Sequence, residues 1–178
     1  LRATAKTTRL GLDFNTNVAG DNKLGGKVEV DFAGSTTDSN GALRIRHAYL
    51  TYNNWLFGQT TSNFLSNHAP EMIDFATNVG GGTAARIPQV RYGFNLAPAT
   101  KLFISAEEGD SSGKNIKYSV PNLTAKLTQG FADGKGSVSA RALVENYKSA
   151  DDSDTAWGLA AGVNYQVMDP LKISADVS

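Results

Sequence analysis

The 178-residue chain carries 17 Lys+Arg and 17 Asp+Glu. This zero net charge argues against a nucleic-acid-binding protein, which needs a basic face. Cysteine is absent, which excludes a disulfide scaffold, a thiolate zinc site and a cysteine nucleophile. No apolar run approaches the roughly 18 residues of a membrane-spanning helix, so a helical membrane protein is excluded as well.

The two ends of the sequence indicate a segment of something longer. There is no initiator methionine and no signal peptide at the start. The last eight residues stop inside an alternating apolar and polar run, with no closing turn. We therefore expect further chain outside residues 1–178.

Apolar side chains recur at every second position in run after run, which predicts β-strands. In chain order the runs lie near residues 10–14, 28–32, 43–46, 55–61, 90–94, 102–107, 123–128, 138–145, 157–167 and 171–176. The clearest is 157–167, whose odd positions are all apolar and whose even positions are all small or polar. Its length matches the about 9–11 residues that a tilted strand needs to cross a bilayer. Leu143 breaks the alternation in its run.

The connections between these runs alternate between short and long. They are predicted at 15–23, 33–42, 53–54, 62–85, 95–100, 109–122, 132–136, 148–155 and 168–170. The first connection, 15–23, should be a short turn in this alternation but is predicted to be long. A transmembrane barrel has short turns at one rim and loops at the other, whereas a soluble β-sandwich has no reason for this order.

One face of the predicted strands is charged. Its members are Arg9, Lys27, Arg44, Arg46, Arg91, Lys126, Arg141 and Lys172, with Asp13, Glu29, Asp31, Glu107, Glu145 and Asp176. This face is the solvent side of a sandwich or the wet lumen of a wide barrel. Several aromatics lie near strand ends, as in the interfacial girdles of membrane barrels: Phe14, Phe32, Tyr49, Trp55, Phe94, Tyr147 and Trp157.

We therefore predict an all-β, transmembrane antiparallel β-barrel segment over residues 1–178. The apolar set is expected to face lipid: Leu10, Leu12, Val28, Val30, Leu123, Leu127, Leu159 and Val163. Their neighbours, including Arg9, Lys27, Lys126 and Gly162, are expected to face the lumen.

No catalytic, nucleotide-binding or metal-binding motif is present, so we expect neither an enzyme nor a cofactor. His47 and His68 have no ligand companions, and His47 fits a strand residue near the membrane edge better than a metal ligand. The glycines at 80–82 lie in a long connection without a following helix, which favours a hinge over a phosphate cradle. Asp151, Asp152 and Asp154 lack the spacing of an EF-hand and fit a solvated loop.

The connection 62–85 is longer than an ordinary loop. Connections of this length are usually functional or disordered. It carries apolar residues that can pack inward, and Asn63, His68, Glu71 and Asp74 as polar members. We predict that it folds into the lumen opposite an anion-attracting wall of Arg44, Arg46 and Arg91, narrowing the pore. Two alternatives remain open. The loop could instead cover the barrel top or contact a neighbouring subunit, and Glu29, Asp31 or Glu107 could neutralise the arginines so that they only stiffen the wall.

Three stretches resemble the DcaP-like family of outer-membrane porins: HAYLTYNNWLFGQTTSNF at 47–64, HAPEMIDF at 68–75 and RIPQVRY at 86–92. The resemblance implies a homotrimeric, sixteen-stranded barrel in the outer membrane of Gram-negative bacteria that admits small anions such as dicarboxylates. The family's inward third loop maps onto 62–85, and its basic lumen maps onto Arg44, Arg46 and Arg91. Full-length members also have an N-terminal helical segment and a terminal aromatic residue, neither of which occurs in this sequence.

These observations favour a passive channel, with pore-lining Arg9, Lys27, Lys126 and Arg141 beside the three arginines of the wall. The alternatives are a soluble β-sandwich that binds a ligand at its long loops, and an outer-membrane enzyme for which no nucleophile–base pair is visible. If the barrel has sixteen strands, we expect one strand before Leu1 and about five after Ser178.

Overall fold

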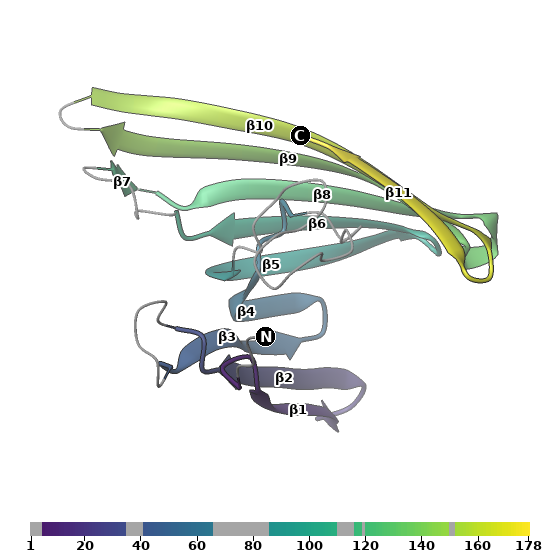
Figure 1. The fold of residues 1–178 in the computed structure, drawn as a ribbon, viewed down its shortest axis with the longest axis horizontal. Coiled ribbons are helices and arrows are strands. Elements are labelled where there is room, and N and C mark those ends of the chain that lie inside the picture. The colour runs from purple at the N-terminus through teal and green to yellow at the C-terminus, as the bar shows by residue number, and fades with distance from the viewer. Residues whose placement is uncertain (1–4, 35–40, 66–85, 110–115, 119, 150–151) are drawn as a thin grey trace, which may run out of the picture.

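The computed structural model describes residues 5–34, 41–65, 86–109, 116–118, 120–149 and 152–178 (Figure 1). Eleven antiparallel strands form one sheet. Their bounds are β1 Arg9–Val18, β2 Asn22–Asp31, β3 Arg44–Tyr52, β4 Trp55–Thr61, β5 Arg86–Ala97, β6 Thr100–Glu107, β7 Ile116–Tyr118, β8 Asn122–Phe131, β9 Gly136–Ser149, β10 Asp152–Met168 and β11 Leu171–Val177.

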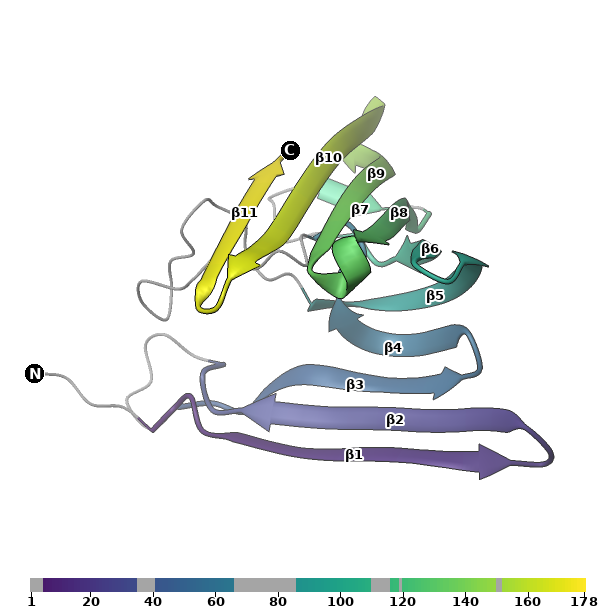
Figure 2. The same ribbon diagram turned by 90° about the vertical axis from the view of Figure 1, so that its right-hand side faces the viewer.

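The sheet is a meander in which each strand pairs with the next, in the order β1-β2-β3-β4-β5-β6-β8-β9-β10-β11. The short β7, which the sequence did not predict, lies off this path and pairs with β9. Figure 2 shows the sheet curving like part of a cylinder wall. The described residues include no helix with the length and apolarity needed to cross a membrane.

Short turns gather at one end of the strands, on the right of Figure 1. They are 19–21, 53–54, 98–99, 132–135 and 169–170. The first turn is shorter than predicted, because β1 continues to Val18, so it fits the predicted alternation. The prediction of a loop at 148–155 was wrong: β9 runs to Ser149 and β10 starts at Asp152.

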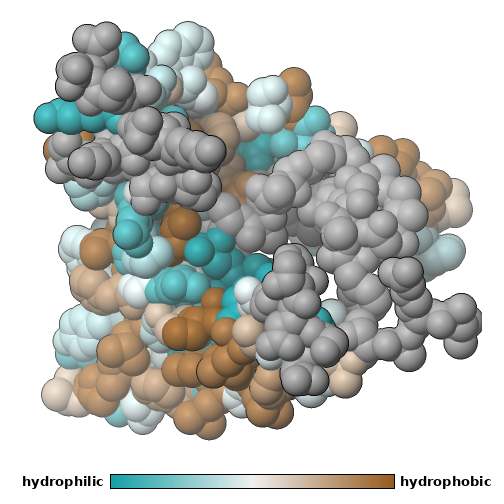
Figure 3. Space-filling view, turned by 60° about the vertical axis from the view of Figure 1, so that its left-hand side comes forward, coloured by the Kyte–Doolittle hydropathy of each residue, from teal (hydrophilic) through white to brown (hydrophobic). Residues whose placement is uncertain are grey.

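Side-chain burial is inverted relative to a soluble protein. Trp157 and Leu12 are 74% and 68% exposed, whereas Glu107 and Arg141 are 2% and 4% exposed. Among the described residues, only Leu56 and Ala160 are hydrophobic and fully buried. Figure 3 shows hydrophilic side chains in the middle of the view and hydrophobic ones around its lower edge. A sandwich would cover its apolar face, so that alternative is not supported.

The two faces of the sheet carry the predicted residues. Seven of the eight predicted lipid-facing residues are exposed, namely Leu10, Leu12, Val28, Leu123, Leu127, Leu159 and Val163. The eighth, Val30, pairs with Leu10 and Ile45 and therefore shares their face. On the opposite side Lys126 and Gly162 are buried. We call these two sides the apolar face and the polar face.

Aromatic rings cluster on the apolar face close to the short turns. Trp55 lies 5.7 Å from Phe57 and 4.7 Å from Tyr92 between ring centroids, and Tyr92 lies 4.6 Å from Phe94. Further along the same rim, Phe131 stacks on Tyr165 at 5.8 Å. Such a band suits the boundary between lipid and water, where an aromatic ring tolerates both environments.

A β-bulge interrupts the pairing of β2 with β3. Glu29 pairs with His47 while Val30 pairs with Ile45, so Arg46 is the extra residue. A bulge re-aims the side chain at its position. Arg46 lies at the bulge, and both it and Arg44 reach the carboxylates of β2.

Candidate pore wall

Arg44 and Arg46 both bind Asp31, the last residue of β2. Arg44 forms a two-pronged pair, with Nε 2.9 Å from Oδ1 and Nη2 2.6 Å from Oδ2. Arg46 places Nη1 2.9 Å from Asp31 Oδ2 and Nε 2.8 Å from Glu29 Oε1. Asp31 is therefore a buried carboxylate that holds two guanidinium groups, and the described geometry favours the neutralised-wall alternative for this pair.

The same network takes in the other two predicted cations of β1 and β2. Lys27 Nζ lies 3.5 Å from Asp13 Oδ2 and 3.4 Å from Glu29 Oε2. Arg9 Nε lies 4.0 Å from Glu29 Oε1. All four predicted cations of β1–β3 thus have carboxylate partners. We call this set, with Asp13, Glu29 and Asp31, the paired wall.

Arg91 on β5 has different surroundings. Its guanidinium carbon lies 5.8 Å from the centre of the Phe103 ring, a cation–π arrangement. Its cross-strand neighbours are Leu56 and Ser105. Within the described ranges, no carboxylate forms an ion pair with Arg91.

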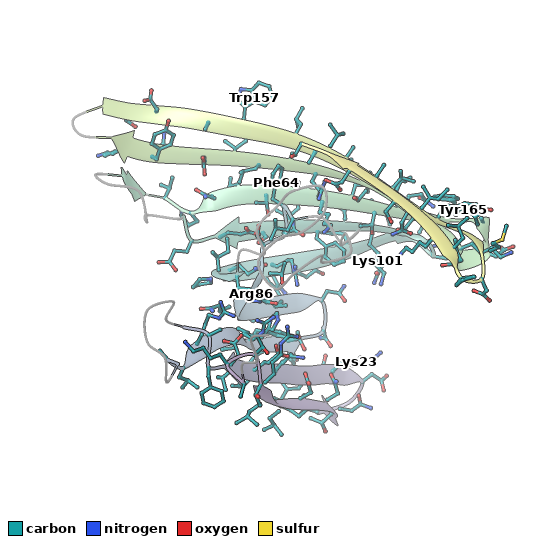
Figure 4. The ribbon with its side chains drawn as sticks, in the orientation of Figure 1. Lys23, Phe64, Arg86, Lys101, Trp157 and Tyr165 are labelled. Carbon is teal, nitrogen blue, oxygen red and sulfur yellow. The ribbon has the colours of Figure 1, made fainter. Side chains whose placement is uncertain are left out.

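Arg91 opens onto a pocket of about 290 Å³ near the short turns. Its lining residues are Thr51, Asn53, Asn54, Trp55, Leu56, Arg91, Gly93, Asn95, Lys101 and Phe103. Two of them are cations and none is a carboxylate. Lys101, labelled in Figure 4, was missed by the sequence reasoning, although it stands two residues before Phe103 and so shares its face. We call Arg91, Lys101 and this lining the open pocket.

Two further predicted cations lie on β8 and β9 and are almost fully buried. Lys126 donates from Nζ to the backbone oxygen of Leu65 at 2.8 Å. Arg141 Nη2 lies 2.6 Å from Asp176 Oδ1 on β11, across the intervening β10. Lys126 therefore reaches the start of the segment 62–85, and Arg141 belongs to an ion pair.

The start of the long connection folds onto the polar face. Asn63 is 1% exposed, and its backbone N–H donates to Glu107 Oε1 at 2.7 Å. Ser62 Oγ donates to Glu107 Oε2 at 2.6 Å. Residues 62–65 therefore lie on the polar face; the inward course of 62–85 as a whole stays a prediction, and His68, Glu71 and Asp74 lie outside the described residues. From the sequence we had considered Glu107 only as a carboxylate that could neutralise an arginine, and its hydrogen bonds to Ser62 and Asn63 were not predicted.

Where the structure describes them, the remaining sequence candidates form no metal site. His47 lies within β3, and its Nδ1 is 2.9 Å from Thr60 Oγ1. The described part of the chain contains no group of three His, Cys, Asp or Glu that could hold a metal. Asp154, expected in a loop, belongs to strand β10 and pairs with Tyr147. Asp151 and the glycines at 80–82 lie outside the described ranges.

Comparison with known proteins identifies the family. The model of the DcaP outer membrane protein family matches residues 1–174. The chain belongs to the DcaP outer membrane protein family. It is similar to the crystal structure of the outer membrane channel DcaP of Acinetobacter baumannii, with 72% sequence identity and a TM-score of 0.91. That alignment covers 98% of this chain and 52% of the other, so the chain spans about half the length of the DcaP structure.

A comparison with curated proteins gave no match. The DcaP family and the inverted burial agree: the protein is located in the outer membrane, and its sheet is part of a β-barrel wall. The apolar face is then the lipid side and the polar face the lumen side. The fold and family resemblance predicted from the sequence are confirmed.

Proposed function

We propose that this protein is an outer-membrane channel through which small solutes diffuse passively, with a preference for anions such as dicarboxylates. The observation that carries the anion preference is the open pocket. It presents Arg91 and Lys101 on the polar face, and its lining among the described residues includes no carboxylate. The DcaP structure to which the chain is similar is itself described as an outer membrane channel.

The chemistry of the pocket suits transient binding of a carboxylate. The Arg91 guanidinium stays charged at any working pH and can grip a carboxylate with two N–H donors. The amides of Asn54 and Asn95 line the same pocket and can replace part of the solute's hydration shell. Because the pocket opens onto the polar face, a bound anion can leave it again, which conduction requires.

The segment 62–85, with Asn63, His68, Glu71 and Asp74, is proposed to narrow the passage on the lumen side. What supports this is the position of residues 62–65, which lie on the polar face and are hydrogen-bonded to β6 and β8. In this proposal the open pocket, more than Arg44 and Arg46, supplies the attraction for anions. The arginines of the paired wall mainly hold the strands β2 and β3 together.

Homotrimeric assembly in a Gram-negative outer membrane belongs to the same proposal and is suggested by the family. Chemical crosslinking of outer membranes tests it. Three bands, at one, two and three times the subunit mass, are expected as the crosslinker concentration rises. A monomer that never crosslinks to itself would contradict the trimer.

The channel itself is tested with the full-length protein in planar lipid bilayers under a tenfold KCl gradient. We expect step-like currents and a reversal potential displaced towards the chloride equilibrium potential. Addition of a dicarboxylate such as succinate to one side should reduce the chloride current through competition for the same cations. Absence of current steps would contradict the channel, and a reversal potential on the potassium side would contradict the anion preference.

A further inference from the structure

Residues 62–65, which we call the anchor segment, lie along one row of the sheet. Ser105 on β6 pairs with Thr124 on β8. Thr124 pairs in turn with Leu143 on β9, and Leu143 pairs with Gly158 on β10. The anchor segment contacts Phe103 and Glu107, which flank Ser105 on β6, then Thr124 on β8, and its Phe64 ring lies beside Gly158 on β10, so the segment runs along this row.

Glu107 holds the near end of the anchor segment. Beside Ser62 Oγ and the Asn63 N–H, its carboxylate accepts hydrogen bonds from Ser105 Oγ at 2.8 Å and from Thr124 Oγ1 at 3.1 Å. These four donors are neutral, and they place three hydrogen bonds on Oε1 and one on Oε2. A buried carboxylate so satisfied fixes its donors in place, because each would otherwise be left without a partner away from water.

Asn63 and Lys126 hold the middle of the segment. Asn63 Nδ2 lies 3.2 Å from both the Phe103 backbone oxygen and Thr124 Oγ1. The Lys126 ammonium donates to the Leu65 backbone oxygen. Side chains of β6 and β8 thus bind both the backbone and the side chains of the segment.

Phe64 marks the far end, and it lies against a glycine. A Cβ atom added to Gly158 would stand 3.3 Å from Phe64 Cζ and 3.9 Å from Leu143 Cβ. Figure 4 shows Phe64 among the strands of the wall, whereas Trp157, the neighbour of Gly158, projects away from β10. This contact explains why Leu143 breaks the alternation of its strand: it faces the polar side, beside the ring of Phe64.

We propose that Glu107 and Gly158 are positioning residues for solute passage: they fix the anchor segment across the lumen side of the wall, and its fixed course sets the width of the passage. Glu107 holds Ser62 and Asn63 at the start of the anchor segment, and Gly158 lies against the ring of Phe64, so the two contacts limit different movements. This inference rests on the proposed channel function for its consequence, but the course of the segment can be tested without any transport.

The first experiment tests that course by cysteine crosslinking in outer membranes. The chain has no native cysteine, so Asn63→Cys with Thr124→Cys gives a defined pair. We expect rapid crosslinking by a mild oxidant or a short bismaleimide. The matched control pairs Asn63→Cys with Thr128→Cys, which lies on the same face of β8 but four residues, or about 13 Å, beyond Thr124. Equal crosslinking of both pairs would overturn the assigned course, whether or not the protein conducts.

The second experiment measures single-channel currents of the full-length Glu107→Gln variant. Glutamine keeps the shape of glutamate but replaces one acceptor oxygen by an N–H donor, so it cannot accept all four hydrogen bonds as the carboxylate does. We expect the single conductance level of the native channel to split into several levels, with an unchanged reversal potential. Glu108→Gln, which removes the neighbouring exposed charge, should behave like the native channel. A single native level in Glu107→Gln would overturn the role of Glu107.

The third experiment addresses the far end and remains informative if Glu107→Gln fails to fold. Gly158→Leu should displace the Phe64 ring and also split the conductance level. Adding Phe64→Ala to Gly158→Leu should restore a single level, because the leucine then occupies the volume of the ring. Ala161→Leu, on the apolar face of the same strand, is the control. A double variant no different from Gly158→Leu would overturn the role of the contact.

Discussion

The paired wall on β1–β3 and the open pocket between β3 and β6 carry the same kind of basic side chain in different surroundings. In the paired wall, Asp31 and Glu29 bind Arg44 and Arg46 at 2.6–2.9 Å. On β6, two residues from the Ser105 that pairs with Arg91, the buried carboxylate of Glu107 is occupied by hydroxyl and backbone donors. In the proposed channel, the attraction of a lumen wall for anions therefore depends on whether its cations are paired with carboxylates as well as on their number.

The largest expected effect comes from breaking the paired wall with Asp31→Asn. Removal of this charge leaves two guanidinium groups with one carboxylate, Glu29. Breaking a buried pair costs about 3–5 kcal/mol, and because Arg44 keeps access to water we expect about 2–3 kcal/mol here. Urea unfolding in detergent, followed by heat-modifiable gel migration, measures the loss. A variant as stable as the native protein would contradict the pairing.

The second prediction contrasts Arg91→Gln with the double variant Arg44→Ser and Arg46→Ser. A unit charge about 5 Å from a passing ion in water contributes about 0.8 kcal/mol, or about fourfold in local anion concentration. We expect Arg91→Gln to lower the anion-to-cation permeability ratio about two- to fourfold at low salt. The double variant should change the ratio less, because its charges are compensated. The reversal potentials of the two variants, measured in the same salt gradient, give the two permeability ratios. A larger change in the double variant would contradict the assignment of the anion preference to Arg91.

The third prediction uses salt to separate the two regions. Charges in contact with water are screened over about 30 Å at 0.01 M salt but only about 3 Å at 1 M. The anion preference supplied by the open pocket should therefore fade towards unity as KCl rises, and the difference between the native channel and Arg91→Gln should fade with it. Stability contributed by the buried Asp31 should change much less. Reversal potentials and urea midpoints at matched salt test both statements.

The smallest effect is expected for Asp13→Asn at the exposed edge of the paired wall. Asp13 meets Lys27 at 3.5 Å, and its side chain is largely exposed to water. Exposed pairs contribute about 0–1 kcal/mol, so the urea midpoint should hardly move. The variant is the control for Asp31→Asn, since both remove one carboxylate from the same network. A loss as large as that of Asp31→Asn would show that net charge, not burial, determines the stability of this wall.

The strands and their facing could be predicted because alternation is a local property of the sequence. Leu12 and Lys126 were placed on the correct faces from their immediate neighbours alone. Strand ends were less predictable, because the polar residues of β1 between Asn15 and Asn17 look like a turn when read without the partner strand. Their pairing with β2 keeps them in the sheet.

The candidate site was less predictable than the fold, since it depends on contacts between distant segments. Arg44 and Arg46 were recognised as cations on one face, but the bulge at Arg46 and the capture of both by Asp31 are not visible in the spacing. Lys101 could have been found from its position two residues before Phe103. The role of Glu107 could not, because its donors at Ser62 and Asn63 stand more than forty positions away in the sequence.

The meander order of the sheet has a consequence for how such a wall can change over evolutionary time. Every long strand pairs with the next long strand in the sequence. Each hairpin therefore consists of two strands that pair with each other and are joined by a short turn. Duplication or loss of one hairpin would alter the circumference by two strands while leaving every other pairing and the direction of every other strand intact. A wall built in this way can vary its diameter by gene rearrangement in whole-hairpin steps, without redesigning the strands that remain.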